Sequence, residues 1–214
     1  MRLEKGAEVF TAVGEKIGKL NRVVIDAQTR DVTDLVVERG LFENEKVIPM
    51  GLVDNENEDR IMLREHNQGV DDFPDYETTQ YVPIDQVTSP YENVETYYWY
   101  PPVNYQLPPS AFLPGVRGMS DHVLRTETSI PEGRVAISEG AQVISSDDKH
   151  IGNVEQVIVN SETNHMTHFV VGKGFLLKEH KLVPAFWATE VDDDKIYLSV
   201  EANVFEHLPD YQPS

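Results

Sequence analysis

The sequence has no cysteine, few basic residues and no long hydrophobic run. Without cysteine the chain can form no disulfide, hold no iron–sulfur cluster or cysteine-ligated zinc, and use no thiol in catalysis. Lys and Arg total 18 against 37 Asp and Glu, a net charge of −19, which argues against nonspecific binding to DNA, RNA or an anionic membrane. No apolar run approaches the ~20 residues that span a bilayer, and the N-terminal residues lack the apolar region of a signal peptide. We therefore expect a cytoplasmic protein without membrane insertion.

The two ends of the chain repeat each other. An offset of 134 aligns Gly6-Ala7 with Gly140-Ala141 and Val36-Val37 with Val170-Val171. One inserted residue in the second copy changes the offset to 135, which aligns Pro74-Asp75-Tyr76 with Pro209-Asp210-Tyr211. We interpret the copies as two homologous domains, residues 1–79 and 137–214, separated by a connector, residues 80–136.

Each copy is predicted to be a small β-barrel. Val23 to Asp26 and Val32 to Val37 are rich in β-branched residues, and Ala27 to Asp31 supplies polar turn residues between them. About six short strands in ~75 residues favour a closed or nearly closed barrel, because closure removes exposed edges. The predicted fold is therefore all-β, with Val36, Val37, Val170 and Val171 in equivalent central strands. We also expect the two barrels to pack about a pseudo-twofold axis as an intramolecular pseudo-dimer, with a short helical piece near Asn203 to Leu208.

The connector differs from the repeats in composition. Nine of the 13 prolines lie between Pro74 and Pro131, a density that disfavours helices and sheet interiors. We expect an extended or polyproline-like segment that is more loosely ordered from Ala111 to Thr126.

Aromatic residues of the connector are the candidate partner-binding residues: Tyr97, Tyr98, Trp99, Tyr100 and Tyr105. Such side chains are enriched in binding hot spots, and no basic residue lies between Gln80 and Val116 to support stacking on RNA. Two interpretations stay open: the aromatics cover and join the barrels, or they form a docking surface for a partner, including proline-rich recognition. We expect Trp99 to be mostly buried, so that Trp99→Ala destabilises the chain by about 3 kcal/mol. A docking role would instead leave the melting temperature unchanged and abolish retention of a partner.

The repeated motifs resemble a known family. They are Gly6-Ala-Glu-Val, Ile17-Gly18-Lys-Leu, Val23-Val24-Ile25-Asp26, Thr33 to Val37 and Lys46 to Pro49, with counterparts from Gly140 to Pro184. This pattern resembles the PRC-barrel, the β-barrel domain of the photosynthetic reaction-centre H subunit and of the C-terminal half of a ribosome-maturation factor. The chain lacks the membrane helix of the former and the N-terminal domain of the latter. The resemblance implies two tandem PRC-like barrels and a domain used for docking onto larger assemblies, in a family whose members have unrelated roles.

Histidines offer a metal-site hypothesis. His165 and His168 are three residues apart, and they converge if His165 belongs to a turn and His168 to a strand, with His180 or Glu155 as a third ligand. The alternative is that these histidines are solvated.

Three other motifs are predicted to be structural. The acidic runs Glu56 to Asp59 and Asp192 to Asp194 lack the spacing of an EF-hand, so we interpret them as solvated turns between strands. Gly172-Lys173-Gly174 lacks the P-loop spacing and the following helix, so we interpret it as the end of a strand.

The sequence favours a non-enzymatic protein-binding or scaffold module. It contains no complete catalytic, cofactor or metal motif, so we assign none of these sites, and we expect an unidentified protein partner rather than bulk nucleic acid. One alternative is an accessory factor for a ribonucleoprotein or for assembly of a membrane complex. Another is an enzyme or metal-binding protein with an unrecognised histidine or carboxylate site. Assembly of the pseudo-dimer into a further homo-oligomer stays open.

Overall fold

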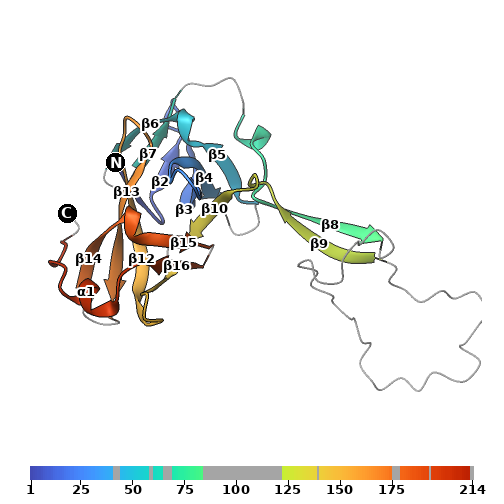
Figure 1. Cartoon of the computed structure of the whole chain (residues 1–214). Coiled ribbons are helices and arrows are strands. Elements are labelled where there is room, and N and C mark those ends of the chain that lie inside the picture. Colours follow the sequence, from blue (N-terminus) through green and yellow to red (C-terminus); the bar gives the residue numbers. More distant parts are fainter. Residues whose placement is uncertain are drawn as a thin grey trace, which may run out of the picture. The chain divides into compact units, whose positions relative to one another are not determined.

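Two sheets of the same design, one from each end of the chain, make up most of the structure (Figure 1). The computed structural model describes residues 1–40, 44–57, 60–64, 69–83, 122–138, 140–174, 179–192 and 194–212. The chain divides into two units. One comprises Met1–Tyr76 together with Ser129–Ser214, and the other is Glu77–Thr128.

Barrel 1 is built from six strands in the first repeat. In chain order they are β2 (Glu8–Phe10), β3 (Lys16–Asp26), β4 (Val32–Glu38), β5 (Lys46–Pro49), β6 (Val53–Asn57) and β7 (Arg60–Leu63). They pair in the order β5-β4-β3-β2-β7-β6. Two short 3-10 helices complete the repeat, η1 (Met50–Leu52) and η2 (Val70–Asp72).

Barrel 2 repeats this arrangement strand for strand. Its strands are β11 (Gln142–Ile144), β12 (His150–Val159), β13 (Met166–Lys173), β14 (Glu179–Pro184), β15 (Ala188–Val191) and β16 (Lys195–Leu198). They pair in the order β14-β13-β12-β11-β16-β15, with η5 (Ala185–Trp187) in the place of η1 and a short helix α1 (Ala202–Glu206) at the end. The all-β prediction is confirmed, and the four central valines lie in β4 and β13 as expected.

Close strand crossings explain why two glycines recur at the same place in both repeats. A Cβ atom at Gly18 would lie 2.2 Å from the carbonyl oxygen of Glu38. At Gly152 it would lie 2.6 Å from the carbonyl oxygen of Gly172. Both distances are far below van der Waals contact, so only glycine lets the long strands β3 and β12 approach their neighbours here.

Each barrel receives one strand from outside its own repeat. β1 (Arg2–Glu4) precedes barrel 1 but pairs with β12 of barrel 2, with Leu3 opposite Val157. β10 (Arg134–Ser138) precedes barrel 2 but pairs with β3 of barrel 1, with Ile137 opposite Val23. The offset of 134 relates one strand pair to the other, so the exchange is reciprocal and in the same register. Neither exchanged strand was predicted from the sequence.

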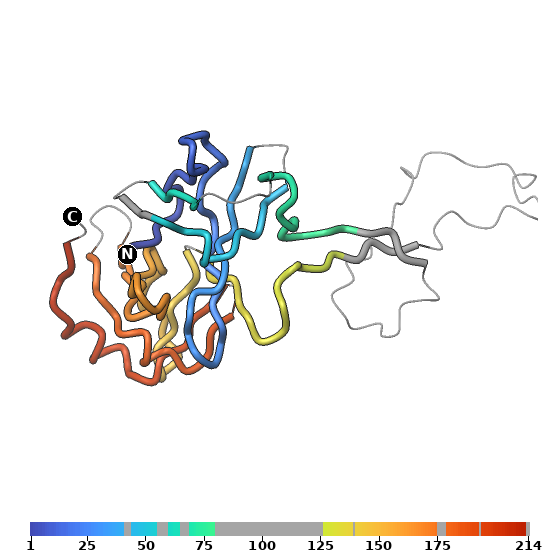
Figure 2. The backbone as a smooth tube through the Cα atoms, turned by 90° about the horizontal axis from the view of Figure 1, so that it is seen from above, coloured from blue at the N-terminus to red at the C-terminus, as the bar shows by residue number. Residues whose placement is uncertain are grey.

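The exchanged strands are held by burial and by side-chain contacts. Leu3 and Ile137 are almost completely buried, in one hydrophobic core that includes residues of both barrels. Arg134 Nη1 in β10 lies 2.8 Å from Asp34 Oδ2 in barrel 1. In Figure 2 the N-terminus lies against the orange segments of barrel 2, as the pairing of β1 requires. Neither barrel is therefore complete without the other.

The segment expected to be an extended connector begins and ends in strands. β8 (Glu77–Pro83) and β9 (His122–Thr128) pair antiparallel along their whole length, with Pro83 opposite His122. The expectation of loose order up to Thr126 is therefore wrong for the residues in β9. β-branched residues such as Thr79 and Thr126 favour strands, and the only proline in either strand is Pro83, the last residue of β8.

Candidate functional site

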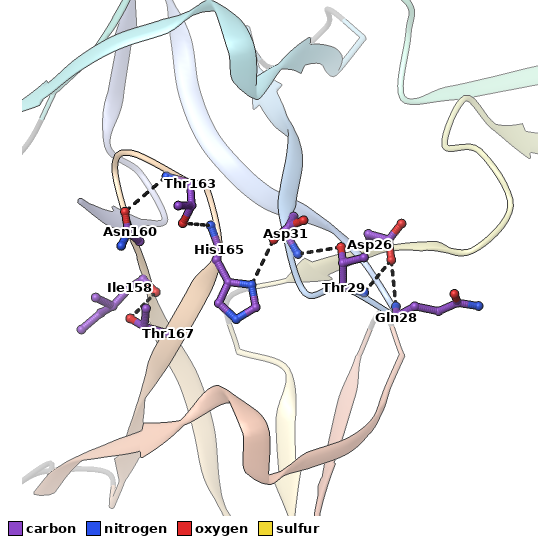
Figure 3. Close-up of polar contacts among 9 residues, drawn as sticks. All are labelled: Asp26, Gln28, Thr29, Asp31, Ile158, Asn160, Thr163, His165 and Thr167. Carbon is purple, nitrogen blue, oxygen red and sulfur yellow. Dashed lines mark hydrogen bonds and ion pairs between the residues drawn. The ribbon is translucent and has the colours of Figure 1, made fainter.

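The two barrels meet at a pair of hairpin turns. His165, at the start of β13, points toward Asp31, at the start of β4 (Figure 3), and His165 Nδ1 lies 3.0 Å from Asp31 Oδ1. These two residues are equivalents under the repeat offset. Both side chains are about half exposed, so the contact lies at the surface of the junction rather than in the core.

Backbone hydrogen bonds reinforce this junction symmetrically. The amide of Val32 donates to the carbonyl oxygen of Asn164 at 2.8 Å, and the amide of Met166 donates to that of Arg30 at 3.0 Å. Arg30 and Asn164 are also equivalents, and both have positive φ, 60° and 58°. Equivalent residues therefore face each other across the junction, which is the geometry that a twofold axis generates.

Both turns are built by the same side-chain contacts. The carboxylate of Asp26 accepts hydrogen bonds from the backbone amides of Gln28 and Thr29, and the amide oxygen of Asn160 does the same in barrel 2 (Figure 3). The two backbone donors lower the pKa of Asp26 below its ordinary value, the Thr29 amide most strongly. These polar residues define the turn, so their recurrence in the sequence reflects local structure.

A second polar pair lies elsewhere in barrel 2. His180 Nε2 on β14 is 2.7 Å from Glu155 Oε2 on β12, and both side chains are mostly buried. Gly172 lies between them on β13, where a Cβ would come within 2.3 Å of the Glu155 carboxylate. In barrel 1 the amide of Asn21 donates to the carboxylate of Glu45 in the same place. The pair therefore belongs to a contact that both barrels make.

The structure separates the histidines of the metal-site hypothesis. His165 contacts barrel 1, His180 contacts Glu155, and His168 lies on β13 opposite Ile158 and Pro184. Within the described ranges, no three His, Asp or Glu side chains come close enough to share a metal ion.

A hollow of about 370 Å³, lined by polar and apolar groups alike, lies beside the same part of barrel 2. Its lining includes His150, Asn153, Glu155 and Lys173. The Lys173 ammonium is 3.2 Å from Glu206 Oε1, so its charge is already paired with a carboxylate. Gly172-Lys173-Gly174 stands at the end of β13, as expected for a strand end rather than a phosphate-binding loop.

The remaining sequence candidates are only partly described. Asp192 and Asp194 of the second acidic run lie between β15 and β16, where the Asp192 amide donates a hydrogen bond to the Lys195 carbonyl oxygen. Asp193 of that run, and Glu58 and Asp59 of the first run, lie outside the described residues. The same holds for all five candidate partner-binding residues, Tyr97, Tyr98, Trp99, Tyr100 and Tyr105, so their interpretation stays a prediction.

Two features of the structure were missed in the sequence. Phe186 in η5 is 70% exposed, although a large aromatic residue normally enters the core. Asp147 accepts hydrogen bonds from three groups, including the backbone amide of Ala202 far away in the sequence. Aligning the two repeats position by position would have singled out both residues, because Phe186 corresponds to Gly51 and Asp147 to Val13.

Comparison with known families assigns the fold. The model of the PRC-barrel domain matches residues 5–68 and 138–203, more than half of the chain. The chain therefore belongs to the PRC-barrel family and carries two copies of its domain. Both matches fall on the strands of barrels 1 and 2. A search of curated proteins found no match. No helix in the described part of the chain is long and apolar enough to cross a membrane.

Proposed function

We propose that this chain is a non-enzymatic adaptor, in which two joined PRC barrels carry the segment Glu77–Thr128 for binding to a partner protein. The observation that carries the proposal is that the segment leaves and re-enters the barrels at one point. The amide of Ser129 donates to the Tyr76 carbonyl oxygen at 2.9 Å, and Ser129 Oγ donates to that of Asp75 at 2.5 Å. A segment with adjacent ends can be varied without disturbing the core that holds it.

The composition of the segment supports a protein partner. It contains the aromatic cluster from Tyr97 to Tyr105, and aromatic side chains supply much of the energy at protein interfaces. The net charge of −19 opposes the counterion release by which nucleic acids are bound. Protein contacts are the kind of binding that this combination favours.

Buried polar groups of the barrels hold neighbouring segments of the chain in place. Lys181 is almost fully buried, and its ammonium donates to the Leu208 carbonyl oxygen and to Asp210 Oδ1, which fixes the end of the chain to β14. Lys46 makes the equivalent contacts with Phe73 and Asp75. Such contacts support a stable carrier rather than a reaction centre.

Excision of the inner part of the segment tests the proposal. Because Pro83 and His122 are paired, an Asn-Gly turn can replace residues 84–121 and close the β8–β9 hairpin directly. We expect the excised chain to keep the melting temperature of the full chain and to lose the proteins that the full chain captures in affinity purification with mass spectrometry. Val13→Ser, at an exposed turn of barrel 1, is the control that keeps both properties. Capture of the same proteins by the excised chain, or capture of none by the full chain, would overturn the proposal.

Trp99→Ala in the full chain separates the two interpretations of the aromatic cluster. An unchanged melting temperature with loss of the captured partner assigns Trp99 to docking. A loss of about 3 kcal/mol of stability, the usual scale for removing a buried aromatic side chain, assigns it to covering a barrel and overturns the docking assignment.

A further inference from the structure

Phe186 is an exposed aromatic residue on the surface of barrel 2. It lies in η5 between two better covered neighbours: Ala185 is 2% exposed, and Trp187 packs against the core. The rings of Phe186 and Trp187 meet edge to face, with centroids 6.3 Å apart. Trp187 therefore anchors the turn, and Phe186 extends from it into solvent.

The fold itself does not require this side chain. The equivalent residue in η1 of barrel 1 is Gly51, and a Cβ built there would meet no atom within 4 Å. The same position therefore faces open space in the barrel that lacks an aromatic residue, and η1 forms without one. An aromatic ring left in water gains nothing from burial, so Phe186 adds no evident stability to barrel 2.

A sheet edge adjoins Phe186. β15 begins two residues later and is the last strand in its sheet, where it pairs only with β16 among the described strands. Arg30 Nη2 of barrel 1 donates to the Ala188 carbonyl oxygen at 2.8 Å, so the first carbonyl group of this strand already has a partner. The edge beyond it, from Thr189 to Val191, is of the kind that accepts an added strand.

Acidic side chains outnumber basic ones along this edge. Glu190 on β15, and Asp192 and Asp194 in the following turn, are exposed. The cations beside them are Lys195 and Arg30. The whole chain carries a net charge of −19. A strand that pairs here therefore meets a negative surface, and a segment with Lys or Arg side chains complements it.

We infer that Phe186 and the free edge of β15 form a docking surface for an extended, basic segment of a partner protein. The segment adds a strand beside Thr189 to Val191, covers Phe186 with an apolar side chain, and places basic side chains near Glu190 and Asp194. This surface lies on barrel 2 itself, so the inference goes beyond the proposed role of Glu77–Thr128 and does not depend on it.

A displayed library of random peptides of about 12 residues, selected on the full chain, tests this surface. We expect the selected peptides to alternate basic and apolar residues. Phe186→Ser should weaken their binding by about tenfold or more, the effect of removing a hot-spot side chain. Glu190→Gln should weaken it less and reduce its salt dependence. Val13→Ser removes another exposed apolar side chain, far from this surface in the sequence, and should bind like the wild type.

Hydrogen exchange of the wild-type complex with a selected peptide tests strand addition. We expect the amides of Ala188–Val191 to gain protection and those of the equivalent strand Val53–Asn57 to remain unchanged. Selection of peptides without basic residues, equal binding by the Phe186→Ser variant, or protection of both strands would overturn the inference. A free wild-type chain that is a dimer, and becomes a monomer in the Phe186→Ser variant, would assign the surface to a second copy and overturn it as well.

Discussion

At the scale of single residues, Asp147 shows how one carboxylate joins distant parts of barrel 2. It accepts hydrogen bonds from Lys149 Nζ at 2.8 Å, from Ser145 Oγ at 2.7 Å and from the Ala202 amide at 2.9 Å. These donors, Lys149 first, hold the pKa of Asp147 well below its ordinary value of 3.8, and the same contact raises the pKa of Lys149. The carboxylate therefore ties the turn before β12 to the first residue of α1.

Asp147→Asn should lower the melting temperature at neutral pH. Because the pKa of Asp147 is lower in the folded chain than in the unfolded chain, its contribution to stability is fully present above pH 3.8 and is lost as the pH falls through the folded value. Melting curves of wild type and variant should therefore differ at about pH 7 and converge at strongly acidic pH. Val13→Asn, at the equivalent exposed position of barrel 1, is the control. A difference between wild type and Asp147→Asn that persists unchanged in acid would contradict this prediction.

The local sequence around Asp147 indicates a turn but not the contact with Ala202. The run Asp147-Asp148-Lys149-His150 predicts a hairpin turn, and the turn is present between β11 and β12. The contact with Ala202 depends on where the C-terminal helix returns to barrel 2, which local sequence does not encode. The same limit applies to His165, whose partner Asp31 becomes visible only once the barrels are joined.

At the scale of elements, the exchanged strands β1 and β10 make each barrel depend on residues from outside its repeat. We expect Leu3→Ala to destabilise the chain by about 2–5 kcal/mol, because Leu3 is 1% exposed and its removal leaves a cavity. Its effect should appear in the opposite barrel: hydrogen exchange should accelerate in β12 and β13 more than in β3 and β4. Ile137→Ala should give the reverse pattern. If each substitution loosened only the barrel of its own repeat, the exchange would not couple the barrels energetically.

The repeat predicted the six strands of each barrel well and the exchanged strands not at all. Apolar residues recur in β3, β4, β12 and β13 at a fixed offset, and pairing between neighbours along the chain follows from short turns. β1 contains only three residues and its partner lies at the far end of the chain, so neither periodicity nor turn signals reveal it. The sequence offered one sign of the exchange, which is that the offset of 134 aligns Leu3 with Ile137.

At the scale of the whole molecule, the barrels should assemble even when the chain between them is cut. We expect fragments 1–76 and 129–214, expressed together, to form a one-to-one complex, because all strand pairs of the two barrels and of the exchange lie within these residues. Light scattering after size-exclusion chromatography gives the mass of the complex. Each fragment expressed alone lacks a strand and should self-associate or remain unfolded. A folded, monomeric fragment would show that the exchange is dispensable.

Because the two copies are parts of one chain, their sequences can differ at equivalent positions. In a homodimer every substitution appears twice, whereas here Gly51 and Phe186, or Val13 and Asp147, occupy equivalent positions with different surroundings. Barrel 2 carries an exposed aromatic residue and an additional polar contact at positions where barrel 1 has Gly51 and Val13.

The reciprocal exchange also governs the order in which the protein can mature during synthesis. β3 is made early, but β10, which covers its free edge, leaves the ribosome roughly a hundred residues later. Until then the nascent first repeat exposes an unpaired strand edge and the apolar surface that Ile137 will cover. Translation speed through the segment Glu77–Thr128 therefore sets how long this surface is open to chaperones, or to a neighbouring nascent chain of the same kind.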